Sequence, residues 1–294
     1  MKAGLALGVL FLLLISSCQP NIHDHTLRVS VTNWIGYTPL FYAKEKGLLD
    51  PIDIKLINVV SLNENVHLYK AGNSDAFGGT QYEHSVLTSK IPDLVPIMLF
   101  DLSNGGDMIM SNQSISALQS STRQIDAYLE MDSINIIVLN DFIRKFNIDE
   151  SRINYIDRDQ NDISAMQNNS PNKLVIIVTY MPYDIQLKNN GFKEIISTKN
   201  ELDLVVLGAV FTQKEELDAH REQFIALKTI VDQAILSLHT NPKEYYDTIT
   251  PYFVGVSYEE FLKGLDNIVW IHKDLDHALK TRLQGASFPL IDLL

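Results

Sequence analysis

Three short apolar runs limit most strongly what this chain can fold into. They cover Leu94–Phe100, Leu174–Thr179 and Val205–Phe211, and the first lies between Asp93 and Asp101. Runs that are apolar throughout are typical of strands buried on both faces, as in sheets covered by helices. Short runs of this kind, separated by helical segments, predict an α/β protein.

The other elements follow from periodicity. Alternation of apolar and polar residues predicts further strands, and apolar residues spaced three to four apart predict helices. The strands are expected at Leu27–Val31, Ile52–Val60 and Ile153–Ile156, and the helices at Thr38–Leu49, Ile134–Phe146, Gln213–Leu238 and Glu259–Leu265. A second strand-and-helix unit thus begins near Ile125, and the final third, with a break at Asn241-Pro242, is expected to be helical.

Length and charge narrow the range of possible folds and partners. The chain has 294 residues, a net charge of -12 and 46% hydrophobic residues. This length exceeds what one small core usually organises, so two lobes are expected. The acidic balance excludes nucleic acid as a partner, because phosphate recognition needs a basic surface.

The N-terminus has the order of a secretory signal. Lys2 precedes the apolar stretch Ala3–Ile15, and two serines stand before Cys18. The stretch of about 13 apolar residues is shorter than the roughly 20 that a membrane-spanning helix needs. We therefore expect residues 1–17 to be a signal peptide that is removed.

A lipid anchor is expected at Cys18. The run Ile15-Ser16-Ser17-Cys18 resembles a lipobox, in which the cysteine is diacylated and becomes the first residue. Cys18 is the only cysteine, so no thiol is left for a disulfide or a metal site. Paired acyl chains anchor a protein stably, which makes residues 18–26 a tether. Gln19, in place of the aspartate of inner-membrane retention signals, favours the outer membrane of a Gram-negative cell.

Three polar motifs carry the functional interpretation. The first, Trp34-Ile35-Gly36-Tyr37-Thr38-Pro39, joins a strand to a helix, where open α/β sheets bind ligands. The second leads from Gly72-Asn73-Ser74-Asp75-Ala76 to Thr80-Gln81-Tyr82-Glu83. The third is Asp101-Leu102-Ser103-Asn104-Gly105-Gly106-Asp107.

These motifs, in this order, resemble the substrate-binding proteins of nitrate, sulfonate, taurine and thiamine-precursor ABC importers. The resemblance implies an α/β fold of the two-lobed periplasmic binding protein type II. Lobe 1 is expected at residues 27–108 and 206–294 and lobe 2 at 109–205, with hinge crossings near Met108–Met110 and Val205–Ala209. The resemblance also implies that the protein captures a small molecule between its lobes and does no chemistry on it.

The expected ligand-binding residues lie in these motifs and in the second lobe, where Ser133 and Tyr180 match the family pattern. They are Trp34, Tyr37, Thr80, Gln81, Glu83, Ser103, Asn104, Asp107, Glu130, Ser133, Asn135 and Tyr180.

Acidic side chains dominate these segments. Glu83, Asp107, Glu130 and Asp132 lie in them, and His84 is the sole imidazole nearby. Aromatic faces and carboxylates together favour a cation, so we expect an amine-bearing or heteroaromatic ligand. Backbone amides at helix starts would favour an anion instead, with His84 as a donor.

Two partners fit such a protein. An ABC permease would receive the ligand from the closed protein. Alternatively, the closed protein would dock on a membrane sensor protein, which would then signal. Both remain open here. In either case we expect a lipid-anchored monomer in the periplasm.

The sequence has none of the motifs that carry catalysis. It lacks a Gly-x-Ser-x-Gly elbow, a phosphate-binding P-loop and His-Glu-x-x-His. His272 and His277 are five residues apart and do not share a helix face, which argues against a metal site there. We expect no enzymatic activity, no cofactor and no metal.

Overall fold

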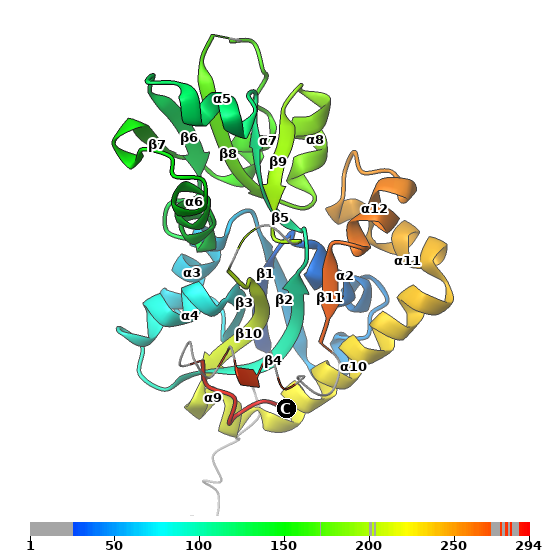
Figure 1. Ribbon diagram of the computed structural model, residues 1–294. Coiled ribbons are helices and arrows are strands. Elements are labelled where there is room, and N and C mark those ends of the chain that lie inside the picture. Colours follow the sequence, from blue (N-terminus) through cyan, green and yellow to red (C-terminus); the bar gives the residue numbers. More distant parts are fainter. Residues whose placement is uncertain are drawn as a thin grey trace, which may run out of the picture.

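The computed structural model describes residues 26–294 apart from 171, 200, 201, 203, 272–276, 278, 279, 282 and 284–287. The predicted signal peptide, Cys18, nearly all of the tether and His272 therefore lie outside the described residues. What is described forms two α/β lobes, one above the other in Figure 1. This confirms the predicted fold class.

Lobe 1 is built on a six-stranded sheet of order β11-β4-β10-β3-β1-β2. β1 is parallel to β2 and β3, whereas β10 is antiparallel to both of its neighbours, β3 and β4. The strands are β1 (Leu27–Thr32), β2 (Ile54–Val59), β3 (Ala76–Thr80), β4 (Leu94–Ser103), β10 (Leu207–Gln213) and β11 (Ile268–Trp270).

Lobe 2 is built on a five-stranded sheet of order β7-β6-β8-β5-β9. β6 is parallel to β7 and β8, and β5 runs antiparallel between β8 and β9. The strands are β5 (Asp107–Ser111), β6 (Ile125–Leu129), β7 (Ile153–Asp157), β8 (Leu174–Tyr180) and β9 (Lys193–Ser197).

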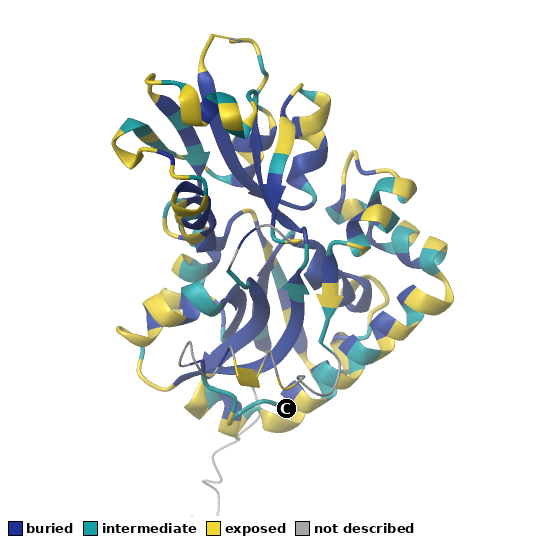
Figure 2. Ribbon diagram, viewed as in Figure 1, coloured by how far each residue is buried: buried dark blue, intermediate teal, exposed yellow. Residues whose placement is uncertain are grey.

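Helices cover the faces of both sheets, so the sheets are buried and the outer helix faces are exposed (Figure 2). In lobe 1 they are η1 (Ile35–Tyr37), α2 (Thr38–Glu45), η2 (Asp50–Ile52), α3 (Leu62–Lys70), α4 (Gln81–Thr88), α9 (Lys214–Ala219), α10 (Arg221–Thr240), α11 (Pro242–Ile249), η4 (Thr250–Tyr252) and α12 (Tyr258–Leu265). In lobe 2 they are α5 (Ile115–Ser120), α6 (Ile134–Lys145), η3 (Glu150–Arg152), α7 (Gln160–Ser164) and α8 (Tyr183–Asn189).

The apolar runs form the centre of each sheet because both of their faces are buried. In β8, Val175 and Ile177 pack into one core, whereas Ile176 and Val178 pack into the core on the other face. This is the alternation that a strand imposes on its side chains. The run predicted from Leu174 is therefore confirmed as a doubly covered strand.

The C-terminal third departs from the prediction in two places. The helix predicted over Gln213–Leu238 is divided at His220, whose φ of -118° lies outside the helical range. The strand β11 then adds an edge to the lobe 1 sheet by pairing with β4, in a stretch that was expected to be helical. The helix break at Asn241-Pro242 is confirmed, because α11 begins at Pro242, where a proline is favoured.

The chain crosses from the first sheet to the second between Ser103 and Asp107 and returns between Ser197 and Leu207. The outward crossing thus lies just before Met108–Met110, which are inside β5. Gly105 has a φ of +118°, a conformation that other residues rarely adopt. That glycine makes the sharp change of direction possible.

Candidate ligand-binding site

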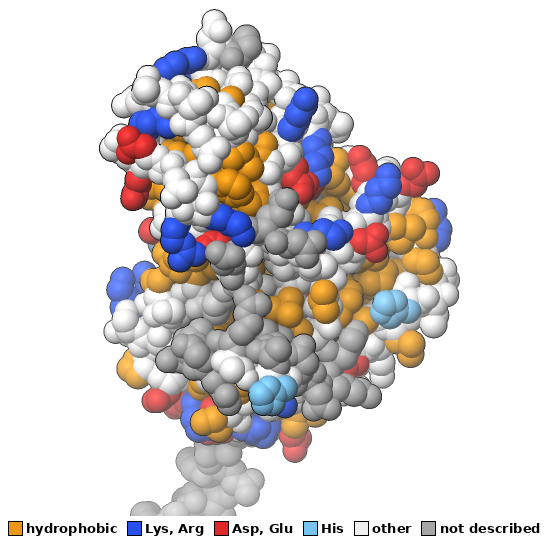
Figure 3. All heavy atoms as spheres, in the orientation of Figure 1, with side chains coloured by type: hydrophobic (Ala, Val, Ile, Leu, Met, Phe, Trp, Pro, Cys, Tyr) orange, Lys and Arg blue, Asp and Glu red, His pale blue; other side chains and the backbone are white. Residues whose placement is uncertain are grey.

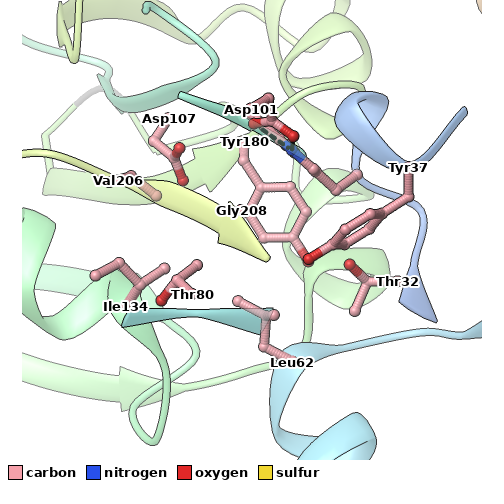
Figure 4. Close-up of a pocket in the computed structure, with 11 residues that line it drawn as sticks. Thr32, Tyr37, Leu62, Thr80, Asp101, Asp107, Ile134, Tyr180, Val206 and Gly208 are labelled. Carbon is pink, nitrogen blue, oxygen red and sulfur yellow. Dashed lines mark hydrogen bonds between the residues drawn. The ribbon is translucent and has the colours of Figure 1, made fainter. Parts of the chain in front are cut away.

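A small cavity lies between the lobes, where strands of both sheets end (Figure 4). Its volume is about 30 Å³, room for a water-sized group. The last residues of β1, β3 and β8 reach it, as does the first residue of β5. Its lining residues are Thr32, Trp34, Tyr37, Leu62, Thr80, Asp101, Asp107, Ile134, Tyr180, Val206 and Gly208.

Trp34 and Asp101 form a hydrogen-bonded pair on the lobe 1 side. The indole Nε1 of Trp34 donates to both carboxylate oxygens of Asp101, at 3.0 and 3.1 Å. Gly36 leaves room for this pair, since a Cβ there would lie 1.9 Å from Asp101 Oδ2. Burial raises the pKa of Asp101 to about 7, with a further rise from the charge of Asp107, although the bond from Trp34 lowers it.

Two more lobe 1 side chains reach the cavity with their polar atoms already bonded. The hydroxyl of Tyr37 donates to the backbone carbonyls of Gly79 at 3.2 Å and Ala209 at 3.3 Å. Thr80 donates its hydroxyl hydrogen to Glu83 at 2.5 Å. The exception in lobe 1 is Thr32, whose buried hydroxyl has no hydrogen-bond partner among the described residues.

The lobe 2 side brings polar atoms that lack partners. Neither Asp107 Oδ2 nor the Tyr180 hydroxyl has a hydrogen-bond partner within the described part of the chain, although both residues are buried. Burial raises the pKa of Asp107 to about 7; the Ser103 hydroxyl lowers it and the charge of Glu83 raises it further. Burial and then the charge of Glu130 raise the pKa of Tyr180 well above its ordinary value.

Glu130 and Asn135 lie in lobe 2 outside the cavity lining. Glu130 is 3% exposed, and neither of its carboxylate oxygens has a hydrogen-bond partner in the described ranges. Burial raises its pKa to about 8, although the backbone amides of Leu62 and Gln160, which lie near the carboxylate without forming a well-aligned hydrogen bond, lower it. The side-chain oxygen of Asn135 accepts a bond from Gln160, whereas its Nδ2 has no partner among residues that are described.

Glu83, in contrast, is fully bonded and joins the lobes. Its Oε2 accepts from the amide of Thr80 at 2.8 Å, which completes a capping box at the start of α4. Its Oε1 accepts at 2.9 Å from the amide of Ile134, the first residue of α6 in lobe 2. One carboxylate therefore caps a helix in each lobe.

The remaining predicted residues support the crossings and helix starts. The Gln81 amide side chain bonds to the carbonyl of Val205 and the amide of Leu207. The Ser103 hydroxyl bonds to Thr198 at 2.8 Å, and Ser133 is the N-cap of α6. The backbone amide of Asn104 donates to Asn267 at 2.8 Å.

The structure thus brings five of the predicted residues to the cavity: Trp34, Tyr37, Thr80, Asp107 and Tyr180. Sequence reasoning missed six: Thr32, Leu62, Asp101, Ile134, Val206 and Gly208. Asp101 carried a usable signal, because it directly follows the apolar run Leu94–Phe100, and in the structure it is a buried acid within β4. Val206 and Gly208 carried none, since they reach the cavity only through long-range strand pairing.

The cavity is acidic without a basic counterpart. None of the described residues that line it is lysine, arginine or histidine. The imidazole of His84 instead bonds the carbonyl of Leu94 at 3.0 Å and stacks on Phe211. On the face shown in Figure 3, acidic and basic side chains are interspersed.

The described residues include neither a candidate metal cluster nor a candidate membrane span. No group of three or more histidine, cysteine, aspartate or glutamate residues among them could hold a metal ion. No helix among them combines the length and apolar character needed to cross a membrane.

Solved structures with the same architecture are numerous, although no family model and no curated protein matches this sequence. The alkanesulfonate-binding protein SsuA of Xanthomonas axonopodis pv. citri, bound to MOPS, aligns with a TM-score of 0.71 at 12% identity over 90% of this chain and 92% of its own. The ligand-binding component of an ABC-type import system from Staphylococcus aureus, with zinc bound, gives 0.71 at 11% over 89% and 91%.

The periplasmic nitrate-binding protein NrtA of Synechocystis PCC 6803 gives a TM-score of 0.63 at 15% identity over 81% of this chain and 69% of its own. At such identities the likeness establishes architecture. The chain has the two-lobed fold of the periplasmic binding proteins of type II.

Proposed function

We propose that this chain is an extracytoplasmic solute-binding protein that closes around a small amine-bearing ligand and delivers it to an ABC importer. The observation that carries the proposal is the interlobe cavity, whose buried carboxyl groups have no cationic partner among the described residues. The shared fold with ligand-binding components of importers supports the class of function.

The sign of the ligand follows from electrostatics. An anion in this cavity would meet Asp101 and Asp107, and no described basic side chain lines the space to balance it. Burying a charge without a partner costs several kcal/mol, on the order of the whole affinity of a weak ligand. A cation pairs with the carboxyl groups instead. We therefore propose that the ligand differs in charge from the alkanesulfonates and nitrate named for the similar structures.

Size favours an amine over a heteroaromatic ring. An apolar cavity that holds benzene has a volume of about 150 Å³. The cavity here is about 30 Å³. The closed space holds an ammonium group by itself, whereas a ring has no end this small; the carbon arm of an amine would still need the lobes to move apart.

Binding is proposed to proceed by closure of one lobe on the other, as a monomer. The lobe boundaries expected after residues 108 and 205 move to the crossings Ser103–Asp107 and Ser197–Leu207, because Asp107 is the first residue of β5 in the second sheet. Two chain crossings are few enough to act as a hinge. Small-angle scattering should show a smaller radius of gyration at saturating ligand and the mass of one chain. An unchanged radius would contradict closure, provided that the ligand-free protein is not already closed.

The protein is proposed to be held at a membrane surface of the periplasm by acyl chains on Cys18. The basis is the sequence alone: a signal-like N-terminus and a single cysteine. Cys18→Ser should move the protein from the membrane fraction to the soluble fraction. A variant that still sediments with membranes after salt extraction would refute the anchor.

The central test is calorimetry of the wild-type protein with ethanolamine and with methanesulfonate. We expect ethanolamine to bind and the sulfonate not to bind. Sulfonate binding without amine binding would overturn the proposed ligand while leaving the fold and the closure untouched.

A further inference from the structure

We infer that the site is built for a primary ammonium group, whose three N–H donors meet the three unpartnered oxygens of Thr32, Asp107 and Tyr180. This inference rests on the proposed function, since it assumes a cationic ligand. It adds that the nitrogen carries hydrogens and no methyl groups.

The three oxygens belong to the lining of one cavity and are unused. Thr32 Oγ1, Asp107 Oδ2 and the Tyr180 hydroxyl each belong to a residue that lines the cavity and is at most 3% exposed. None of them has a hydrogen-bond partner among the residues that the structure describes. In Figure 4 the Asp107 carboxylate lies beside Val206 and the Thr32 side chain beside Tyr37, with the Tyr180 ring between them.

The number of acceptors matches the donors of –NH₃⁺. Hydroxyl and carboxylate oxygens all accept hydrogen bonds, and an ammonium group offers three donors and no acceptor. Buried polar atoms are almost always bonded, so three unpartnered oxygens around one cavity indicate a missing hydrogen-bonding group. The hydroxyls of Thr32 and Tyr180 can accept or donate, but an ionised Asp107 only accepts, and it is this oxygen that calls for a donor. Each N-methylation of the ligand would leave one of these oxygens unsatisfied.

The aromatic residues argue against a quaternary ammonium group. Such groups are bound by open ring faces that form a cage. Here the ring of Tyr180 meets Trp34 edge to face at 6.0 Å and Tyr183 at 5.4 Å, and the ring of Tyr37 packs against Phe100 at 5.4 Å. The rings are therefore engaged with one another, and the polar atoms of the wall face the cavity.

Charge balance agrees with a single compact cation. Asp107 supplies a carboxylate oxygen directly, and Asp101 lies beside the cavity with both of its oxygens accepting from Trp34. Glu83 is committed to helix caps and does not line the cavity. Asp107 is thus the one acid of the lining with a free oxygen among those described.

The test uses the series ethanolamine, N-methylethanolamine, N,N-dimethylethanolamine and choline, which keeps the arm and the positive charge while replacing N–H by methyl. Binding is followed by the fluorescence of Trp34 in a Trp270→Phe background, where it is the only tryptophan. Each methyl group should weaken binding by about tenfold, the effect of one unsatisfied buried acceptor.

Tyr180→Phe removes one acceptor and should reduce the preference for ethanolamine over choline by about tenfold. Tyr245→Phe is the matched control, because Tyr245 is a buried tyrosine outside the cavity lining. It should leave the preference unchanged.

The outcomes separate the two proposals. Amines that bind with no dependence on methylation, or choline that binds as tightly as ethanolamine, would overturn the primary ammonium inference and leave the cation proposal standing. Failure of every amine, with or without binding of methanesulfonate, would overturn both.

Discussion

The two lobes contribute to the cavity in different states of hydrogen bonding. Lobe 1 supplies Trp34, Asp101 and Tyr37, whose polar atoms are bonded within that lobe. Its one exception in the lining is Thr32, whose hydroxyl has no partner among the described residues. Lobe 2 supplies Asp107 and Tyr180, each with a buried oxygen that has no partner in the described chain.

The contrast indicates a division of labour. Bonds within lobe 1 fix its side chains before any ligand arrives, and groups that are already ordered lose little entropy on binding. The unsatisfied groups of lobe 2 favour a ligand strongly because leaving them bare in a closed cleft is costly. Lobe 1 therefore shapes the site, and lobe 2 makes closure depend on what fills it.

Asp107→Asn should have the largest effect on the contribution of lobe 2 to binding. A buried ammonium that loses its carboxylate partner costs roughly 3 kcal/mol or more, so amine affinity should fall at least about a hundredfold. The ligand-free variant should be at least as stable as the wild type, because burial disfavours the Asp107 carboxylate. Calorimetry and thermal denaturation measure both. Retained amine affinity would place the counter-charge elsewhere.

Gly36→Ala tests whether the hydrogen-bonded side chains of lobe 1 are rigid. The new Cβ would lie 1.9 Å from Asp101 Oδ2 and 2.3 Å from the Nε1 of Trp34, so the pair must separate. Overpacking of this kind costs about 1–3 kcal/mol of folding free energy. Denaturant unfolding should show that loss together with weaker binding of every ligand. Full stability would mean that the pair can shift without cost, and lobe 1 would not be the rigid half.

Glu83→Gln should weaken the binding of all ligands to the same extent. The glutamine amide can offer only one accepting oxygen, so either the α4 cap or the bond to the Ile134 amide is lost. A lost bond of this type costs about 1–2 kcal/mol, which is about tenfold in affinity. Glu260→Gln is the matched control, because Glu260 completes a capping box confined to α12. Selective loss of amine binding by Glu83→Gln would instead assign Glu83 to the ligand.

The effect that bears least on ligand affinity is the dependence of stability on pH. Burial raises the pKa of Asp101 and Asp107 to about 7 and that of Glu130 to about 8, above the roughly 4 of exposed carboxyl groups. The folded protein then binds more protons than the unfolded chain, so the stability of the ligand-free form falls as pH rises from about 4 to 8.

Melting temperatures measured across that range should fall as pH rises, by about 2–4 °C for each kcal/mol of stability lost in a domain of this size. Glu130→Gln and Asp107→Asn, both in lobe 2, should flatten the curve. If both variants kept the wild-type dependence of melting temperature on pH, Glu130 and Asp107 would not be the groups whose protonation sets the stability.

The fold could be predicted because local patterns determine it. The runs at Leu94–Phe100 and Leu174–Thr179 are apolar, bounded by polar residues and placed between helical segments, and each became a central strand. β11 could not be predicted, because a three-residue strand has too little pattern and is defined by its pairing with β4.

The site was predictable only in part. Some residues expected at strand ends and crossings do reach the cavity, among them Trp34, Asp107 and Tyr180. Glu83 was expected to contact the ligand, yet the spacing Thr80-x-x-Glu83 is that of a capping box, and the structure places the carboxylate on helix amides. Whether a buried acid faces a ligand or a helix start depends on long-range packing that the sequence does not display.

The shared cap at Glu83 has a consequence for solvent exchange. The amide of Ile134 is at the start of α6, where no carbonyl of its own helix can accept from it. Its acceptor belongs to lobe 1, so it is protected only while the lobes are together. Deuterium uptake at this single amide therefore reports how often the cleft opens, and ligand should slow it while leaving the interior of α6 unchanged.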